Sequence, residues 1–402
     1  MKAREGTPSG GILAALALCM ALQWTGFSMF LPLFALRFES FGAGVQALSA
    51  SDMAYFLTFA LTAPLAGMLA DRIGRRPVIL LSLAGGVLVF VGYLAAGSTW
   101  LLILLRGLAG VFAAGVLPGV VSVVGDLAPA DRRAQWIGVV NGGAAVGYTV
   151  GPLLGGLLHE RFGYGALSGV AIGMAAGALL LALLRIRESH APAARLSHPP
   201  MTWRQEWRAL PARRALLLVM VITFGAMLAY AIVQPQFMFY AYDDLRWTSS
   251  QLGLVMSGYG ISFMVCAFAL GRLSDRAGRK PVLVLGLALF SAQFVGLMLF
   301  REVGWIMGSF LIAGMGNALY DPPLSALILD IIPAEHTASV LGLKSMAGSM
   351  GSTLGPAFVV LFAGHLTPRM GFLTAAALVA VLVLIAGLAL RPPGRGRVGL
   401  QP

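Results

Sequence analysis

Long apolar stretches separated by short polar breaks run along nearly the whole chain. A helix needs roughly 20 apolar residues to cross a bilayer, and these stretches lack the alternation that marks a strand of a transmembrane barrel. Only helices and closed barrels satisfy their backbone hydrogen bonds within lipid, so the pattern predicts membrane-spanning helices. The expected spans are 11–36, 49–70, 77–97, 99–126, 134–158, 162–184, 214–240, 250–273, 281–300, 304–331, 337–363 and 370–390.

These twelve spans divide into two sets of six because one charged break is repeated. Residues 67–79 and 271–283 share their glycine, acid, arginine and proline positions at an offset of 204, and the same offset matches Asp126 with Asp330 and Pro152 with Pro356. We expect an N-terminal half (1–184), a linker (185–213) and a C-terminal half (214–402). Repeats in the same orientation imply a two-fold axis along the membrane normal and a cavity between the halves at the midplane.

Composition supports lipid as the outer solvent, since 58% of residues are apolar and 11% are charged, against roughly 25% charged in ordinary soluble domains. If both termini are cytoplasmic, 21 of the 28 basic residues lie on the inner side, as the positive-inside rule expects. The net charge of +12 records this asymmetry, with anionic membrane lipid as counter-charge, and needs no nucleic acid. The fold class is therefore all-α integral membrane, with twelve transmembrane helices in two pseudo-symmetric halves.

The polar stretch from Arg185 to Arg214 holds seven arginines and four prolines. Within it, Trp203 and Trp207 are four residues apart and share a helical face, which suits a short helix in the inner headgroup region. A solvated basic linker is the alternative.

The first charged break resembles the signature between helices two and three of the major facilitator superfamily, and its second copy, with Asp275 and Arg279, stands where that family often repeats it. The residues that carry the resemblance in the first copy are Gly67, Asp71, Arg72, Gly74 and Arg75. Helix five resembles the pattern of that family's twelve-helix drug/proton antiporters through Gly147, Gly151, Pro152, Gly155 and Gly156. Helix four matches in part, because Ala109 replaces the glutamine of the family's arginine-containing element that begins at Arg106.

That resemblance implies proton-coupled export of a small-molecule substrate by alternating access, by a monomer in a bacterial inner membrane. The distribution of arginine and lysine predicts that both termini are cytoplasmic. The resemblance implies no cofactor. It also implies that the loop acts as a gate that holds the halves together when the cavity faces outward, with the second copy chiefly fixing topology. From the residues themselves, Asp71 and Arg75 are four apart and able to pair around the turn, and Asp126 adds to the cluster. Fixing topology is the alternative for both copies.

Charged residues inside the spans are the strongest functional candidates, because each is costly in lipid unless paired or hydrated. Asp321 precedes Pro322 and Pro323, which we expect to break the backbone of helix ten, and Lys344 lies at a comparable depth in helix eleven. We expect the two to be close together, and Asp321 to carry the proton or contact a cationic substrate. A static ion pair between two helices is the alternative.

Arg106 lies within helix four, and Asp52 is the nearest candidate carboxylate. The resemblance implies that Arg106 influences proton transfer, whereas a tie between helices four and one is an equal alternative. The glycines of helix five recur every four residues, a spacing that permits close helix packing, and Pro152 bends the span.

Following the same resemblance, we expect the cavity walls to come from helices one, four, seven and ten. The main polar and aromatic candidates on those helices are Gln23, Trp24, Phe27, Phe30, Tyr230, Gln234, Gln236, Phe237, Tyr240, Asn317 and Tyr320. This lining suits amphipathic, drug-like compounds. An exporter of a dedicated metabolite (a sugar, siderophore or lipid) and a non-transport receptor or scaffold are the alternatives. No nucleotide-binding loop, metal cluster or catalytic constellation is recognisable, so the chain is not expected to be an enzyme.

Overall fold

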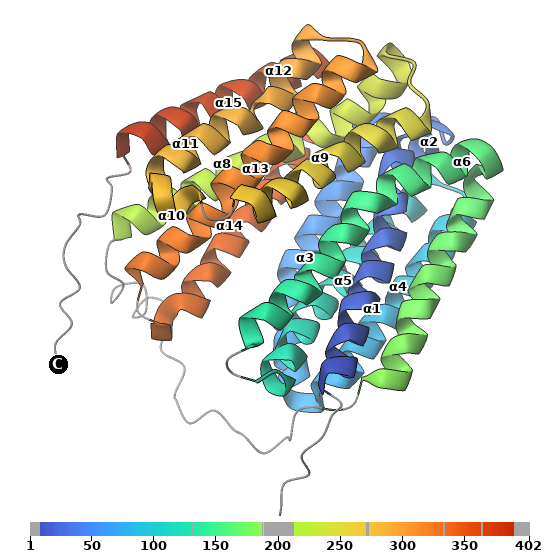
Figure 1. The fold of residues 1–402 in the computed structure, drawn as a ribbon. Helices are drawn as coiled ribbons and strands as arrows, with labels where there is room; N and C mark the ends of the chain where they lie inside the picture. Colours follow the sequence, from blue (N-terminus) through green and yellow to red (C-terminus); the bar gives the residue numbers. More distant parts are fainter. Residues whose placement is uncertain are drawn as a thin grey trace, which may run out of the picture.

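The computed structural model describes residues 9–129, 132–186, 188, 213–270, 273–332, 334–362 and 365–389, and these residues form helices joined by short turns. The helices gather into two bundles (Figure 1). The linker helix expected around Trp203 and Trp207 lies outside the described residues.

The first bundle begins with one pass interrupted near Pro32, followed by three uninterrupted helices and a helix of double length. That last helix turns back at Gly163, whose φ of 78° favours a residue without a side chain. The bounds are α1 Ser9–Met29, η1 Leu31–Leu33, α2 Phe34–Glu39, α3 Val45–Ile73, α4 Arg75–Ala95, α5 Thr99–Leu127 and α6 Arg133–Arg185.

The second bundle repeats this order, although its third pass is interrupted at Ser291 and its first pass ends in a π-helical turn. The bounds are α8 Arg213–Phe239, η2 Tyr240–Asp244, α9 Ser249–Leu270, α10 Leu273–Ala277, α11 Arg279–Phe290, α12 Ala292–Leu299, α13 Val303–Ile331, α14 Ala334–Leu361 and α15 Pro368–Ala389.

These elements confirm the expected twelve-helix architecture. Ten helices of the described ranges are long and apolar enough to cross a membrane, and α6 is long enough to do so twice. Helix α14 is not among these ten, because Lys344 and several serines and glycines interrupt its apolar residues and lower its mean hydropathy. One expectation is wrong: α13 continues through Pro322 and Pro323 without a break. Each proline removes one backbone donor, and the rest of the helix remains hydrogen-bonded.

The chain alternates between two ends of the molecule. We call the end that holds Ser9, Arg185, Arg213 and Ala389 the terminal end, and the opposite end, which holds Gly163, the distal end. The bundles contact each other where α9 packs on α6 and α14 packs on α3. Toward the terminal end the two bundles diverge (Figure 1).

Hydrogen bonds join the bundles in the distal half of the interface. The Tyr242 hydroxyl donates to the Pro32 carbonyl at 2.7 Å, and the Ser249 hydroxyl donates to the Gly156 carbonyl at 3.1 Å. Deeper in the molecule, the Leu153 amide donates to the Ser257 hydroxyl at 3.1 Å. The structure is therefore held closed on its distal side.

Candidate functional site

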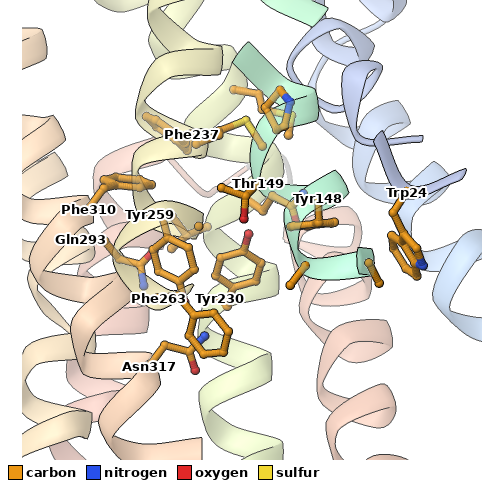
Figure 2. Close-up of a pocket in the computed structure, with 18 residues that line it drawn as sticks. Trp24, Tyr148, Thr149, Tyr230, Phe237, Tyr259, Phe263, Gln293, Phe310 and Asn317 are labelled. Atoms are coloured by element: carbon orange, nitrogen blue, oxygen red, sulfur yellow. The ribbon is translucent and has the colours of Figure 1, made fainter. Parts of the chain in front are cut away.

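A central cavity of about 390 Å³ lies between the bundles. Helix α6 forms one wall, α8 and α9 form the facing walls, and α1, α12 and α13 contribute single residues or pairs. Seven aromatic rings, three amide side chains and one threonine dominate the lining, and the described residues add no charged group to it. The rings of Tyr230, Tyr259 and Phe263 gather on one side, whereas Trp24 stands apart on the other (Figure 2).

Five of the expected cavity residues line this central cavity: Trp24, Tyr230, Gln234, Phe237 and Asn317. The others lie elsewhere. Gln23 and Phe27 line a pocket of about 30 Å³ inside the first bundle, together with residues of α3, α4 and α5. Gln236 and Tyr240 line a separate cavity at the distal end.

The expectation is wrong for Phe30 and Tyr320, which are about 1% exposed and pack inside their own bundles. Phe30 contacts the rings of Phe90 and Tyr93, and Tyr320 contacts Phe290. Both are on the expected helices, but their side chains point away from the interface. The cause is the rotation of each helix about its axis, which a sequence apolar on all sides leaves open.

Several cavity residues were not anticipated, because we expected helix four rather than helices five, eight and nine to form the walls. The residues concerned are Tyr148, Thr149, Met256, Tyr259, Phe263 and Gln293, with Phe310 of α13 beside them. A sequence signal existed for two of them, since Tyr148 and Thr149 lie inside the glycine motif of helix five. Helix four instead borders the small pocket of the first bundle through Ala109, Phe112 and Ala113.

The glycine motif of α6 packs against α1, as its spacing predicts. The Ser28 hydroxyl donates to the Gly147 carbonyl at 2.9 Å. A Cβ on Gly151 would lie 2.8 Å from the Thr25 carbonyl oxygen, and a Cβ on Gly155 would lie 2.8 Å from the Cα of Met29. Real Cβ atoms do not approach so closely, so these positions require glycine.

The second bundle repeats this close packing, with α14 against α8. A Cβ on Gly351 would lie 2.9 Å from the Leu228 amide, and one on Gly355 would lie 2.6 Å from the Cβ of Ala231. Gly156 and Pro152 have a different role, because they face α9 across the interface between the bundles. The motif thus combines packing within a bundle and contact between bundles.

Replacing Gly151 by valine is expected to destabilise the protein by about 1–3 kcal/mol, since the added side chain overpacks the α1–α6 contact. Thermal unfolding in detergent, followed by intrinsic fluorescence, measures the effect. Gly173→Val is the matched control on the same helix, because a Cβ there meets no atom within 4 Å. Equal losses for the two variants would contradict the assigned packing role.

Arg106 and Asp52 form a salt bridge inside the first bundle. Their side chains are 2% and 5% exposed, respectively. The guanidinium carbon lies 4.6 Å from the ring centre of Phe34 and 4.8 Å from that of Tyr55, so aromatic faces enclose the cation. The pair joins α5 to α3, and it confirms Asp52 as the partner expected for Arg106.

Asp321 and Lys344 also lie together, which confirms the expectation that they are close. The Lys344 Nζ donates to Asp321 Oδ1 at 2.6 Å and to the Ser325 hydroxyl at 2.6 Å. The Asp321 side chain is 40% exposed, unlike Asp52. It faces an open cavity of about 580 Å³ between α3 of one bundle and α8, α13 and α14 of the other, which we call the charged cavity.

Trp24 connects the two sites, because its side chain lines both the central cavity and the charged cavity. A molecule in the central cavity can therefore contact a side chain that also lines the cavity faced by the ion pair. Nothing in the sequence distinguished Trp24 from the other aromatic residues of the first span.

Each of the two charged breaks forms an ion pair between helices, and the two pairs are equivalent. Arg75 pairs with Asp126, and Arg279 pairs with Asp330 with its Nε at 2.8 Å from Oδ2. Both pairs obey the repeat offset of 204 and join the third pass of each bundle to its fourth. The side chains of Asp71 and Asp275 lie outside the described part, so the expected pairing of Asp71 with Arg75 stays a prediction.

The first break has an additional contact. Glu188, just beyond the end of α6, accepts the Arg75 amide at 3.0 Å and the Arg76 amide at 3.2 Å. These are free donors at the start of α4, where a carboxylate is favoured. Gly74 adopts a φ of 103° directly before them, and Arg72 is exposed on the preceding turn. Gly67 has no contact that would require glycine.

Two six-helix bundles that enclose an aromatic cavity and a separate ion pair define a multi-pass membrane protein of the transporter class. Comparison with known proteins makes the family definite. The chain belongs to the Major Facilitator Superfamily, whose family model matches residues 16–241 and 219–401.

Among its relatives, the multidrug resistance protein MdtG of Serratia proteamaculans is 26% identical over 90% of this chain and 89% of the relative. The class C tetracycline resistance protein of Escherichia coli is 28% identical over 76% of this chain and 77% of the relative. A bacterial homolog of the human lysosomal transporter Spinster matches the fold with a TM-score of 0.72 and 16% identity, covering 95% of this chain and 96% of that structure. The last likeness concerns the fold alone.

Proposed function

We propose that this protein is a proton-coupled exporter of amphipathic aromatic compounds and works by alternating access. The observation that carries the proposal is the central cavity, which is lined by seven aromatic rings from both bundles. Trp24 lines both this cavity and the charged cavity, which the Asp321–Lys344 ion pair lines. Such a wall favours apolar, planar molecules and offers few of the hydrogen bonds that a sugar needs. The names of the relatives, multidrug resistance and tetracycline resistance proteins, agree with this substrate class.

Coupling requires a group that binds a proton in one state and releases it in the other. We assign this role to Asp321, because its carboxylate is partly exposed in the charged cavity and its partner Lys344 belongs to a different helix. Rocking of the bundles changes the hydration of both groups and so changes the proton affinity of the carboxylate. Asp52 and Arg106 are enclosed by rings in this state and are assigned to holding α3 against α5.

The halves 1–184 and 214–402 are proposed to rock as units about the α6–α9 and α3–α14 contacts, with 185–213 as their linker. Both termini are placed in the cytoplasm of a bacterium and the protein in its inner membrane, which agrees with the basic residues near the terminal end. The structure then represents a state closed toward the outside. One chain supplies both walls of the cavity, which supports a monomer as the functional unit.

In this scheme the charged breaks act as the gate at the cytoplasmic face. The pairs Arg75–Asp126 and Arg279–Asp330 brace the third pass of each half against the fourth, and in the first copy the Glu188 contact also ties the start of α4 to the end of α6. Among the proton-coupling candidates, we rank Asp321 and Lys344 before Arg106 and Asp52, because the Asp321 carboxylate is partly exposed in the charged cavity whereas the Arg106–Asp52 pair is enclosed by rings.

Purified protein in liposomes tests the proposal. An imposed proton gradient is applied while a panel of aromatic cations and neutral aromatic compounds is supplied, and a trapped pH dye reports proton movement. Substrate-dependent proton flux for aromatic compounds, with none for sugars, is the expected result. Absence of flux across the panel would reject the proposed function.

A single-ring substitution checks the assigned cavity. Phe263→Leu is expected to raise the apparent KM for aromatic substrates by about 3- to 10-fold, because one aromatic contact contributes roughly 0.5–1.5 kcal/mol beyond its buried area. Phe268→Leu is the matched control on the same helix, since that ring is 85% exposed on the outer surface of the bundle. Equal effects of the two substitutions on KM would place the substrate elsewhere.

A further inference from the structure

Two adjacent ionisable residues, His159 and Glu160, lie where α6 meets the start of α9 at the distal end. They precede the turn at Gly163 and fall between the expected spans 134–158 and 162–184, so they belong to the connection between two spans. The imidazole is half-buried and the carboxylate is exposed. Neither side chain lines the central cavity or the charged cavity.

Helices α6 and α9 approach each other to backbone contact at this end. A Cβ on Gly156 would lie 2.7 Å from the carbonyl carbon of Ser249, and a Cβ on Gly253 would lie 2.8 Å from that of Pro152. No side chain fits between helices that are so close. Backbone and small residues therefore make the contact itself, and polar groups at its edge add the directional bonds.

Glu160 supplies a carboxylate to the first turn of α9. Its Oε2 accepts a hydrogen bond from the Ser250 amide at 3.3 Å. That amide is one of the donors that a helix leaves free at its start, where the helix dipole favours a negative charge. Hydrogen bonds from Ser250 and Thr248 lower the pKa of Glu160. The carboxylate therefore stays ionised at every pH above the ordinary glutamate pKa of about 4.3.

His159 contacts the same turn through Ser249. The Ser249 hydroxyl donates its one proton to the Gly156 carbonyl at 3.1 Å, so it accepts a hydrogen bond from His159 Nδ1, 3.2 Å away. A neutral ring with its proton on Nδ1 fits this arrangement. Protonation of Nε2 would add a positive charge beside the start of α9, the end of a helix at which a cation is unfavourable.

Few charges surround His159. Among the described residues, Glu160 is the one whose charge acts on the ring, and Arg161 acts in turn on Glu160. The first turn of α9 offers the ring hydroxyl and amide groups only. The charged residues of the neighbouring distal segments are Arg37 and Glu39 of α2, and Asp243, Asp244 and Arg246 before α9.

The direction of the pH effect follows from the burial of His159. Burial lowers the pKa of the ring in the closed state, and the Glu160 carboxylate raises it in part. Separation of α6 from α9 hydrates the ring and returns its pKa toward the ordinary value of about 6.5. Since the pKa is lower in the closed state, protonation favours the open state. The contribution of His159 to closure is fully present above about pH 6.5 and is lost as the pH falls through the closed-state pKa.

We propose that the distal contact of α6 with α9 is an acid-sensitive latch, in which the Glu160 carboxylate holds the start of α9 and protonation of His159 releases it. The latch goes beyond the proposed export function, which assigns proton coupling to Asp321 in the charged cavity. Only the placement of the distal end on the outside rests on that function. An acidic exterior then opens the exit side without a proton entering the charged cavity.

The distance between the bundles at the distal end tests the latch. Spin labels are attached to Ala166→Cys and Glu302→Cys, two exposed positions on different bundles, in full-length protein with Cys19→Ala and Cys266→Ala. Asp321→Asn is included so that the coupling carboxyl does not titrate. Double electron–electron resonance in nanodiscs measures the ratio of open to closed molecules. This ratio is expected to rise about two- to fivefold between pH 8 and pH 5, the effect of one charge at a helix terminus.

Three variants of this labelled protein assign the response. His159→Gln keeps a hydrogen-bond donor near Ser249 but carries no titratable charge, so it is expected to remove the pH response. His365→Gln is the matched control, because it replaces an exposed histidine of the distal end in the α14–α15 connection, and the response is expected to remain. Glu160→Gln is expected to raise the ratio of open to closed molecules about two- to fivefold at pH 8.

An unchanged pH response in His159→Gln would overturn the latch, and so would a distal distance that does not vary with pH in the labelled parent. Substrate-dependent proton flux by the unsubstituted protein measures the proposed function separately. Flux without a pH-dependent distal distance rejects the latch alone. A pH-dependent distance that disappears in His159→Gln, in a protein without flux, rejects export and retains the latch.

Discussion

Asp321→Asn is expected to abolish proton-driven export, lowering the flux to that of protein-free liposomes, while the protein remains inserted and folded. Asparagine keeps the size of the side chain but cannot exchange a proton, and Lys344 then lacks its counter-charge at 2.6 Å. Substrate exchange without a gradient should persist, because the cavity that binds substrate is separate from the charged cavity. Gradient-driven and exchange transport are measured in the same liposome preparation.

A second substitution separates proton coupling from a static ion pair. If the pair only joins α13 to α14, the neutral combination of Asp321→Asn with Lys344→Met should restore gradient-driven export, since no unpaired charge remains. Proton coupling predicts no restoration, and partial activity for Asp321→Glu, which keeps a carboxyl group. Restored transport in the neutral combination would remove Asp321 from the coupling mechanism.

The repeat offset was the part of the sequence that predicted the most structure. It placed Arg279 and Asp330 at the positions of Arg75 and Asp126, and the structure joins each pair in the same way. Such contacts are predictable because they depend on which helices are neighbours, and the repeat fixes that order. Asp321 and Lys344 were likewise predictable neighbours, because they lie at comparable depth in consecutive helices.

The cavity walls were less predictable, because they depend on the rotation of each helix about its axis. Phe27 lies in the last turn of α1 and Phe30 directly follows its end, yet one borders a small pocket and the other is buried among Phe90 and Tyr93. In a soluble helix the polar face would reveal the rotation. Here lipid replaces water, so lipid-facing and core-facing positions are both apolar.

Helix α8 illustrates the limit most clearly. Gln234 and Gln236 are the same residue type and only two positions apart, but they line different cavities. The two proline residues after Asp321 misled in another way, because packing keeps α13 continuous where local propensity suggests a break. Local rules predicted the helices, and tertiary packing decided which of their faces carry function.

Arg106→Gln is expected to destabilise the protein by about 3–5 kcal/mol, the usual effect of removing one partner from a buried ion pair. The substitution leaves the Asp52 carboxylate, 5% exposed, without a counter-charge. Asp52→Asn should have a comparable effect, because the guanidinium then remains among the rings of Phe34 and Tyr55. Unfolding in mixed micelles, followed by near-ultraviolet circular dichroism, measures both.

The combination of Asp52→Asn with Arg106→Gln should recover more than half of the lost stability, since two neutral amides replace two charges and can bond to each other. Losses that simply add would contradict a direct pair. Transport by the combined variant then assigns the role: a pair that only holds α3 against α5 needs no charge, so export should return with stability. A stable variant that binds substrate but moves no protons would instead place Arg106 and Asp52 on the proton path beside Asp321.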